Sequence, residues 1–102
     1  MRRFVIERNI PGIGIPGTVD LQAAAQTSNA AIKKIGNLKW ELSYVTGDKT
    51  FCIYLAKDEA TILAHAKESG FPANVITEVT TIISPETASG VSFGEPTAAV
   101  HS

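Results

Sequence analysis

The fold is decided by residues 40–54, which read WELSYVTGDKTFCIY. Aromatic, β-branched and polar residues alternate on both sides of Gly47-Asp48, a dipeptide that favours a tight turn. Residues 38–46 and 49–56 are therefore predicted to be two antiparallel strands joined as a hairpin. The stretch specifies a fold better than it specifies a reaction.

A loop with an even number of residues would place the large apolar side chains of these two strands opposite each other. The resulting pairs are Trp40 with Leu55, Leu42 with Ile53, and Tyr44 with Phe51. We expect this apolar stripe to face the helices, so that Cys52 and Tyr54 point to the opposite face of the sheet. An odd loop would instead bury Cys52 and Tyr54. The even loop is favoured because it gathers all the large apolar side chains on one side.

Two more strands flank the hairpin in the sequence. Residues 3–10 alternate as a strand that has Phe4 on one face and Glu7 on the other. Residues 75–83 are rich in β-branched residues and predict the last strand, with Glu78 on the same face as Glu7. These two carboxylates are therefore expected to lie near each other on the face without helices.

Between the strands the apolar period lengthens to three or four residues, which is typical of helices. The first helix is expected to follow Thr18 as its N-cap and to end at Gly36, and the second to run from Asp58 to Gly70. The element order is then βαββαβ. This order predicts an α+β, ferredoxin-like fold, in which both helices cover one face of an antiparallel sheet.

The chain has 102 residues, enough for one domain with its own core. We expect the ferredoxin-like domain to span residues 1–84. Residues 85–102, dominated by small and polar residues, are expected to form a flexible C-terminal tail.

Charge and cysteine content restrict the partners and the compartment. Nine basic and ten acidic residues give a net charge of -1, so neither nucleic acid nor a membrane surface is an expected partner. The one cysteine, Cys52, fits a reducing compartment. The N-terminus lacks the apolar run of a signal peptide. We therefore expect a cytoplasmic protein.

Residues 12–17 read GIGIPG and match the dinucleotide pattern G-x-G-x-x-G. That pattern requires its third glycine inside the opening turn of a helix and a parallel second strand. Here Pro16 precedes the third glycine and the next two strands form a hairpin. We therefore expect a loop that turns the chain and no nucleotide cofactor, although the helix start at Thr18 could hold an anion.

Four residues have the chemistry of ligands for a divalent transition metal. Cys52 is the only thiol, Glu7 and Glu78 are the paired carboxylates, and His65 lies on the second predicted helix near the sheet. Each also has a structural interpretation, as a compact sheet residue, a solvated carboxylate or a histidine at the edge of the core. Tyr54 is a further candidate, for the wall of a ligand pocket.

A set of ordered motifs spanning most of the domain resembles a small bacterial family of unknown function that has nickel-binding members. The motifs are Phe4-Val5-Ile6-Glu7-Arg8, Pro11-Gly12, Ser43-Tyr44-Val45, Asp48-Lys49-Thr50-Phe51-Cys52-Ile53-Tyr54, His65-Ala66, Gly70-Phe71-Pro72-Ala73 and Ile76-Thr77-Glu78-Val79. The resemblance implies a ferredoxin-like fold, a homodimer, and binding of nickel or another divalent transition metal.

Three functional hypotheses follow, and the first is a small cytoplasmic metal-binding protein without catalytic activity. The second is an enzyme like the dimeric α+β-barrel monooxygenases or isomerases, in which Tyr54, His65 and Glu78 would line a pocket for a small organic substrate. The third is a non-catalytic dimerisation module that uses the open face of the sheet. The apolar centre of that interface would be Val5, Val45 and Ile76.

Overall fold

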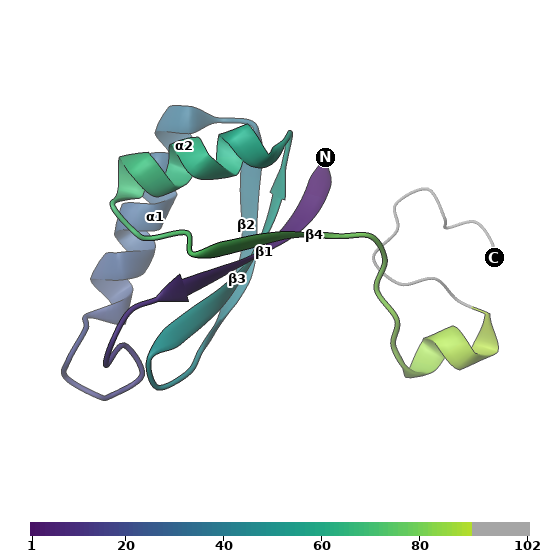
Figure 1. Cartoon of the computed structure of the whole chain (residues 1–102), viewed down its shortest axis with the longest axis horizontal. Coiled ribbons are helices and arrows are strands. Elements are labelled where there is room, and N and C mark those ends of the chain that lie inside the picture. The colour runs from purple at the N-terminus through teal and green to yellow at the C-terminus, as the bar shows by residue number, and fades with distance from the viewer. Residues whose placement is uncertain (91–102) are drawn as a thin grey trace.

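The computed structural model describes residues 1–90. In chain order the elements are β1 (Arg2–Asn9), α1 (Leu21–Ile35), β2 (Leu38–Val45), β3 (Lys49–Ala56), α2 (Glu59–Ser69), β4 (Val75–Val79) and the 3-10 helix η1 (Pro85–Ser89). The strands form an antiparallel sheet in the order β2-β3-β1-β4. Figure 1 shows α1 and α2 on the same face of this sheet. The predicted ferredoxin-like α+β fold is confirmed.

The β2–β3 hairpin has the predicted even loop. Gly47-Asp48 is closed by the Thr46 N–H, which donates to the Lys49 carbonyl at 2.9 Å. Two of the predicted cross-strand pairs are present, Leu42 with Ile53 and Tyr44 with Phe51.

A β-bulge then separates Trp40 from the rest of β2. The register shifts between Trp40 and Leu42, so that Trp40 pairs with Tyr54 and not with Leu55. A bulge places one extra residue, here Glu41, in one strand and reverses the facing of the residues beyond it. Trp40 therefore packs against the core under the helices, while Leu42 lies on the opposite face.

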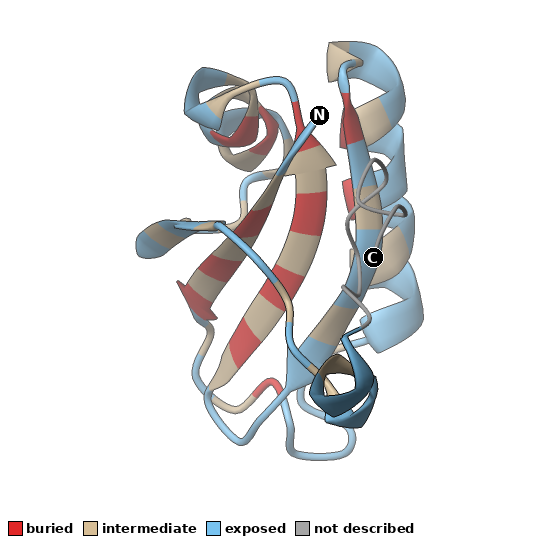
Figure 2. Ribbon diagram, turned by 90° about the vertical axis from the view of Figure 1, so that its right-hand side faces the viewer, coloured by how far each residue is buried: buried red, intermediate tan, exposed pale blue. Residues whose placement is uncertain are grey.

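The facing of β3 is the reverse of the prediction. Phe4 and Ile6 of β1 are buried under the helices, and their direct partners on β3 are Tyr54 and Cys52. Direct partners share a face, so Tyr54 and Cys52 belong to the core, with 2% and 6% of their surface exposed. Figure 2 shows the resulting bands of buried residues along the central strands. The prediction was wrong because β3 carries apolar residues on both faces, and sorting by size chose the wrong one.

The same register shows that two residues of β4 and one of β2 lie on the helix side of the sheet and not on the predicted open face. Ile76 pairs with Ile6 and packs against the core, and Glu78 pairs with Phe4. Val45 pairs with Thr50 on the helix side. Of the predicted interface residues, only Val5 lies on the open face. The other buried members of this core cluster are Leu38, Ala56 and Ile62.

Three of the four predicted helix ends agree with the structure, including the end of α1 at Gly36, and only the start of α1 differs. Asp58 caps α2 by accepting from the Thr61 N–H at 2.9 Å, and Gly70 ends it in the left-handed conformation. At α1 the N-cap is Asp20 and not Thr18, because the Asp20 carboxylate accepts from a backbone N–H one turn into the helix.

The glycine-rich loop before α1 packs against the hairpin turn. The Gly14 N–H donates to the Gly47 carbonyl at 3.1 Å, and the Gly12 N–H donates to Asp48 Oδ1 at 2.9 Å. A Cβ atom on Gly14 would overlap the Thr46 carbonyl oxygen. The glycines of this motif thus permit close packing of two loops.

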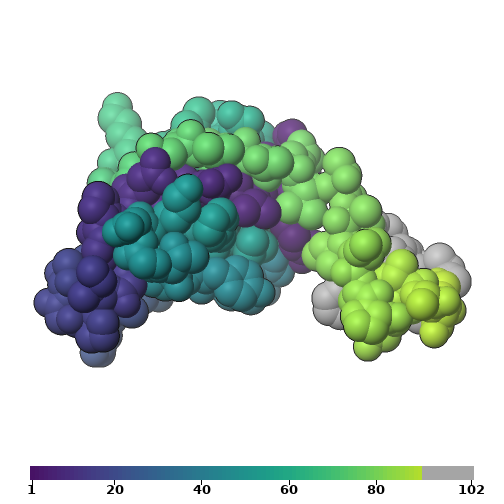
Figure 3. Space-filling view, turned by 60° about the horizontal axis from the view of Figure 1, so that its bottom comes forward, coloured from purple at the N-terminus to yellow at the C-terminus, as the bar shows by residue number. Residues whose placement is uncertain are grey.

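β4 ends at Val79, before the predicted residue 83. The chain then leaves the sheet, and η1 lies apart from the body of the domain (Figures 1 and 3). The predicted boundary after residue 84 stays a prediction, since residues 91–102 of the expected tail, including His101, are outside the described part. Within residues 1–90 no helix is long and apolar enough to cross a membrane.

Candidate functional site

A pocket of about 210 Å³, called the α1 pocket below, lies between the sheet and the N-terminal half of α1. Its apolar lining residues are Ile10, Ile13, Val19, Leu21, Ala24, Ala25, Trp40, Val45 and Phe71. Its polar or weakly polar lining residues are Arg8, Ser28, Ser43, Thr50, Cys52 and Tyr54. Segments that are distant in the sequence therefore line one largely apolar pocket.

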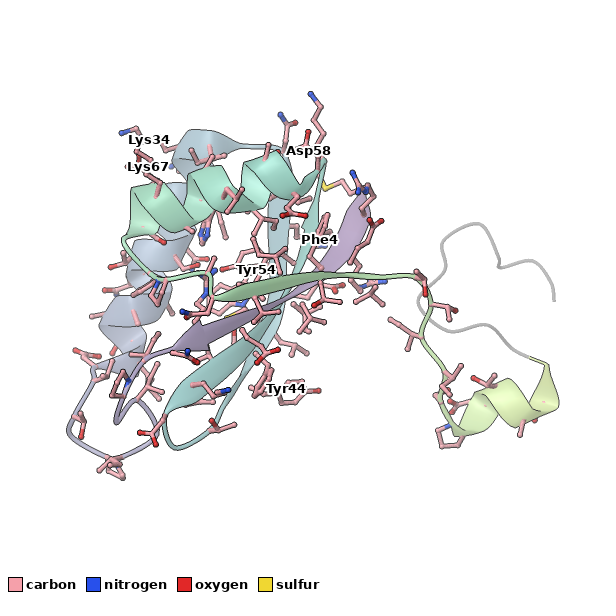
Figure 4. All side chains as sticks on the ribbon, in the orientation of Figure 1. Phe4, Lys34, Tyr44, Tyr54, Asp58 and Lys67 are labelled. Carbon is pink, nitrogen blue, oxygen red and sulfur yellow. The ribbon has the colours of Figure 1, made fainter. Side chains whose placement is uncertain are left out.

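A chain of buried polar groups runs from the wall of the α1 pocket into the core. Ser28 Oγ lies 3.0 Å from the Tyr54 hydroxyl and 3.3 Å from His65 Nε2. His65 Nε2 also lies 3.3 Å from the Ser28 carbonyl oxygen. The Tyr54 and His65 rings are in contact, with centroids 5.1 Å apart. Figure 4 labels Tyr54, which lies in the space between the sheet and the helices.

Burial keeps both ring systems neutral. His65 is 1% exposed, and this burial lowers the pKa of its imidazole, with the nearby Arg8 charge acting in the same direction. A neutral imidazole that donates from Nε2 to the Ser28 carbonyl leaves Nδ1 as an acceptor, and Nδ1 is buried without a partner. Burial raises the pKa of the Tyr54 phenol. Near neutral pH the cluster therefore has one formal charge, on Arg8.

Arg8 is the most unusual residue of the pocket wall. Only 2% of its surface is exposed, and its Nη1 donates to the Pro72 carbonyl at 2.8 Å. The guanidinium carbon lies 5.8 Å from the centre of the Tyr54 ring. Its Nη2 is buried without a hydrogen-bond partner. The site thus holds a buried cation that has spare hydrogen-bonding capacity.

The four predicted metal ligands do not come together. Cys52 lines the α1 pocket, where its sulfur lies 3.4 Å from a threonine hydroxyl, and His65 belongs to the polar chain behind the pocket. Glu7 lies on the open face, 3.7 Å from Lys49 Nζ. Glu78 lies on the helix side of the edge strand.

Glu78 is held away from the pocket by an ion pair with Arg2. The two side chains meet at 2.7 Å and are about half exposed, and the hydrogen bond from Arg2 lowers the pKa of the Glu78 carboxyl. The expected Glu7 and Glu78 pair is therefore wrong, because the two carboxylates are on opposite faces of the sheet. Within residues 1–90 no group of three or more His, Cys, Asp or Glu side chains is arranged to hold a metal ion.

The sequence singled out Tyr54 for a pocket wall and Cys52 and His65 as metal ligands, but it did not single out Arg8 and Ser28. Arg8 had a usable signal, because it continues the alternation of Phe4 and Ile6 and must share their buried face. Ser28 likewise lies on the inward side of α1.

Residues 4–79 match the model of the family described as "Nickel responsive protein SCO4226-like". The chain belongs to this family. The match confirms the resemblance to a small bacterial family with nickel-linked members, and it covers both long helices and all four strands except the first two residues of β1.

The crystal structure of SCO4226 from Streptomyces coelicolor A3(2) is similar to this chain, with a TM-score of 0.64 and 22% sequence identity. The alignment covers 79% of this chain and 99% of that chain. At this identity the similarity concerns the fold alone. A comparison with curated proteins gives no match.

Proposed function

We propose that this protein binds a small organic molecule in the α1 pocket. The observation that supports this best is the combination of an apolar chamber with three adjacent polar side chains, Arg8, Ser28 and Tyr54. Mostly apolar walls with a few positioned polar groups are typical of small-molecule sites. An apolar cavity of about 150 Å³ can hold benzene, so a pocket of about 210 Å³ suits a compound with one ring or a short chain.

Filling the pocket tests this proposal. Ala25 lines the pocket, whereas Ala30 is exposed on the same helix. In an NMR titration with single-ring and short-chain fragments, shift changes should cluster at the pocket residues. Ala25→Phe should abolish them and Ala30→Phe should preserve them. Shift changes that survive Ala25→Phe would contradict the proposal.

The monooxygenase or isomerase hypothesis would use the same pocket. Of its three predicted polar residues, Tyr54 lines the pocket and His65 contacts it through Ser28, whereas Glu78 is distant. Mass spectrometry of fragments incubated with the protein would test this hypothesis. A chemically altered fragment would support catalysis over binding alone.

We propose nickel, or another divalent transition metal, as a second candidate ligand. The family's description supports it. The described residues of one copy do not suit it, because Cys52, His65, Glu7 and Glu78 are dispersed, so the ligands would have to come from two copies. Of the four predicted ligands, Glu7 lies on the open face. A second copy that packs against this face could supply the other ligands of the site.

Calorimetric titration with nickel tests the metal proposal. Glu7→Gln should weaken binding, while Glu78→Gln serves as the matched control because Glu78 is paired with Arg2 at the sheet edge. Cys52→Ser and His65→Ala should leave the titration unchanged. Affinity weaker than about 100 μM, worth only about 5 kcal/mol, would end the proposal.

We propose a homodimer that forms through the open face of the sheet. This face exposes 44% of Leu42, 63% of Tyr44 and 45% of Val75, and Figure 4 shows Tyr44 pointing away from the helices. A sheet that meets water on one side normally alternates apolar and polar residues, but β3 is apolar on both faces. Several exposed apolar side chains on one face of a sheet support an interface there.

Light scattering with a matched pair of variants tests the dimer. Tyr44→Glu on the open face should give a monomer. Leu63→Glu changes an apolar residue of α2 that is 51% exposed, and should leave the mass unchanged. A monomeric wild-type protein at high concentration would refute the proposal.

Two predictions about context remain proposals. We propose a cytoplasmic location, which the free thiol of Cys52 supports, and which cell fractionation can test. We also propose that residues 1–84 are the folding unit. A chain ending at residue 84 should then unfold at nearly the same temperature as the full chain.

A further inference from the structure

Arg8 is a cation without a counter-ion in the part of the chain that the structure describes. The ion pairs there involve Arg2, Arg3, Lys34 and Lys49 but not Arg8. The other buried polar or charged residues are Ser28, Thr50 and His65, and none of them is an acid. An arginine side chain cannot shed its proton, so this charge persists under the helices.

Removing a charge from water is costly unless a partner of opposite sign compensates for it. The Pro72 carbonyl uses one amino group of the guanidinium, and the face of Tyr54 offers a weak further contact. Nη2 stays without a partner. Arg8 lines the α1 pocket, so an anion bound there would pair with the guanidinium once Nη2, which is covered in this structure, turns toward it.

We infer that the α1 pocket takes a small carboxylate with an apolar body, and that Arg8 binds the carboxylate. This inference rests on the proposed function and adds the chemical class of the ligand. The guanidinium fork matches the geometry of a carboxylate. Ser28 and Tyr54, whose hydroxyl groups lie 3.0 Å apart, also line the pocket and offer further hydrogen-bonding groups.

The other walls of the pocket indicate the chemical character of the rest of the ligand, beyond its carboxylate. Ile10, Ile13, Val19 and Leu21 are aliphatic, and Trp40 adds an aromatic surface. The volume of about 210 Å³ exceeds the roughly 150 Å³ that accommodates benzene. An aromatic or short aliphatic monocarboxylate fits these limits, whereas a free inorganic anion would leave the apolar walls unused.

Benzoate and benzamide form a matched pair of probes, since they have nearly the same shape and only benzoate is charged at pH 7. Calorimetry or NMR titration should show benzoate binding more tightly by roughly 10- to 150-fold, the range expected for one hydrogen bond to a charged group. Arg8→Met should remove this preference while retaining benzamide binding. Inorganic phosphate should bind far more weakly than benzoate to the wild-type protein.

Arg8→Lys provides a second test if Arg8→Met fails to fold. It retains the charge but loses the planar fork, so the preference for benzoate should shrink. Equal binding of benzoate and benzamide, or phosphate binding as tight as benzoate binding, would overturn the inference while leaving a small-molecule pocket intact. If neither benzoate nor benzamide nor any neutral fragment binds, both the inference and the proposed function fail.

Discussion

Acidification should destabilise the fold through His65. The imidazole is 1% exposed, has no partner at Nδ1 and faces the Arg8 cation. Burial lowers its pKa in the folded protein, whereas the unfolded chain has the ordinary value of about 6.5. Between these two pKa values the unfolded state binds the extra proton, so the free energy of unfolding decreases as the pH falls.

The magnitude follows from the linkage between proton binding and folding. Stability is lost at up to about 1.4 kcal/mol per pH unit below pH 6.5. From about pH 7.5 to 5.0 the loss is at most about 2 kcal/mol, if the folded pKa lies below this range. For a domain of this size that corresponds to a decrease in melting temperature of roughly 8–16 °C. Carboxyl groups whose pKa is lowered by a hydrogen bond from arginine, such as Glu41, lose their contribution to stability mainly below this range.

Urea unfolding at several pH values between 7.5 and 5.0 measures this effect. His65→Gln keeps a neutral donor for the Ser28 carbonyl and should flatten the pH dependence by up to about 2 kcal/mol. His101→Gln changes the second histidine of the chain and serves as the control, with the wild-type slope expected. A flat wild-type profile, or an unchanged slope in His65→Gln, would refute the reasoning.

Three further predictions concern packing. Ile62→Ala removes a side chain that is 1% exposed, and urea unfolding should show a loss of about 2–5 kcal/mol. Gly14→Ala should lower the melting temperature more than Gly47→Ala, since a Cβ would overlap the Thr46 carbonyl at Gly14 and meets nothing within 4 Å at Gly47. Tyr54→Phe keeps the packed ring but loses one hydrogen bond, so calorimetry should show a cost of about 0.5–1.5 kcal/mol.

The architecture was accessible from local sequence signals because each signal has a short-range cause. The change of apolar period marks where strands give way to helices. Asp58 and Gly70 mark the ends of α2 through backbone hydrogen bonds and a left-handed conformation. Gly47-Asp48 defines the hairpin through a two-residue loop. None of these requires knowledge of distant residues.

The face on which a strand residue lies, and the set of residues that form the pocket, depend on pairings between segments distant in the sequence. Local sequence signals therefore could not predict them. The Glu41 bulge has no local sequence signal, yet it separates Trp40, which packs against the core as predicted, from Leu42, which lies on the open face. The face of β3 is determined by its pairing with β1, far away in the sequence. Arg8 follows from period-two alternation, but it was overlooked because a charged residue is rarely buried.

The pocket itself explains why sorting side chains by size failed on β3. Under the N-terminal half of α1, the helix presents Ala24, Ala25 and Ser28, and the strand opposite presents Thr50 and Cys52. These side chains are too small to fill the space between the layers, so a chamber remains. A rule that places the largest apolar residues in the core chooses the wrong face wherever small residues preserve a cavity. Local rules tend to fail at functional sites, and the failure here coincides with the place where a small molecule would bind.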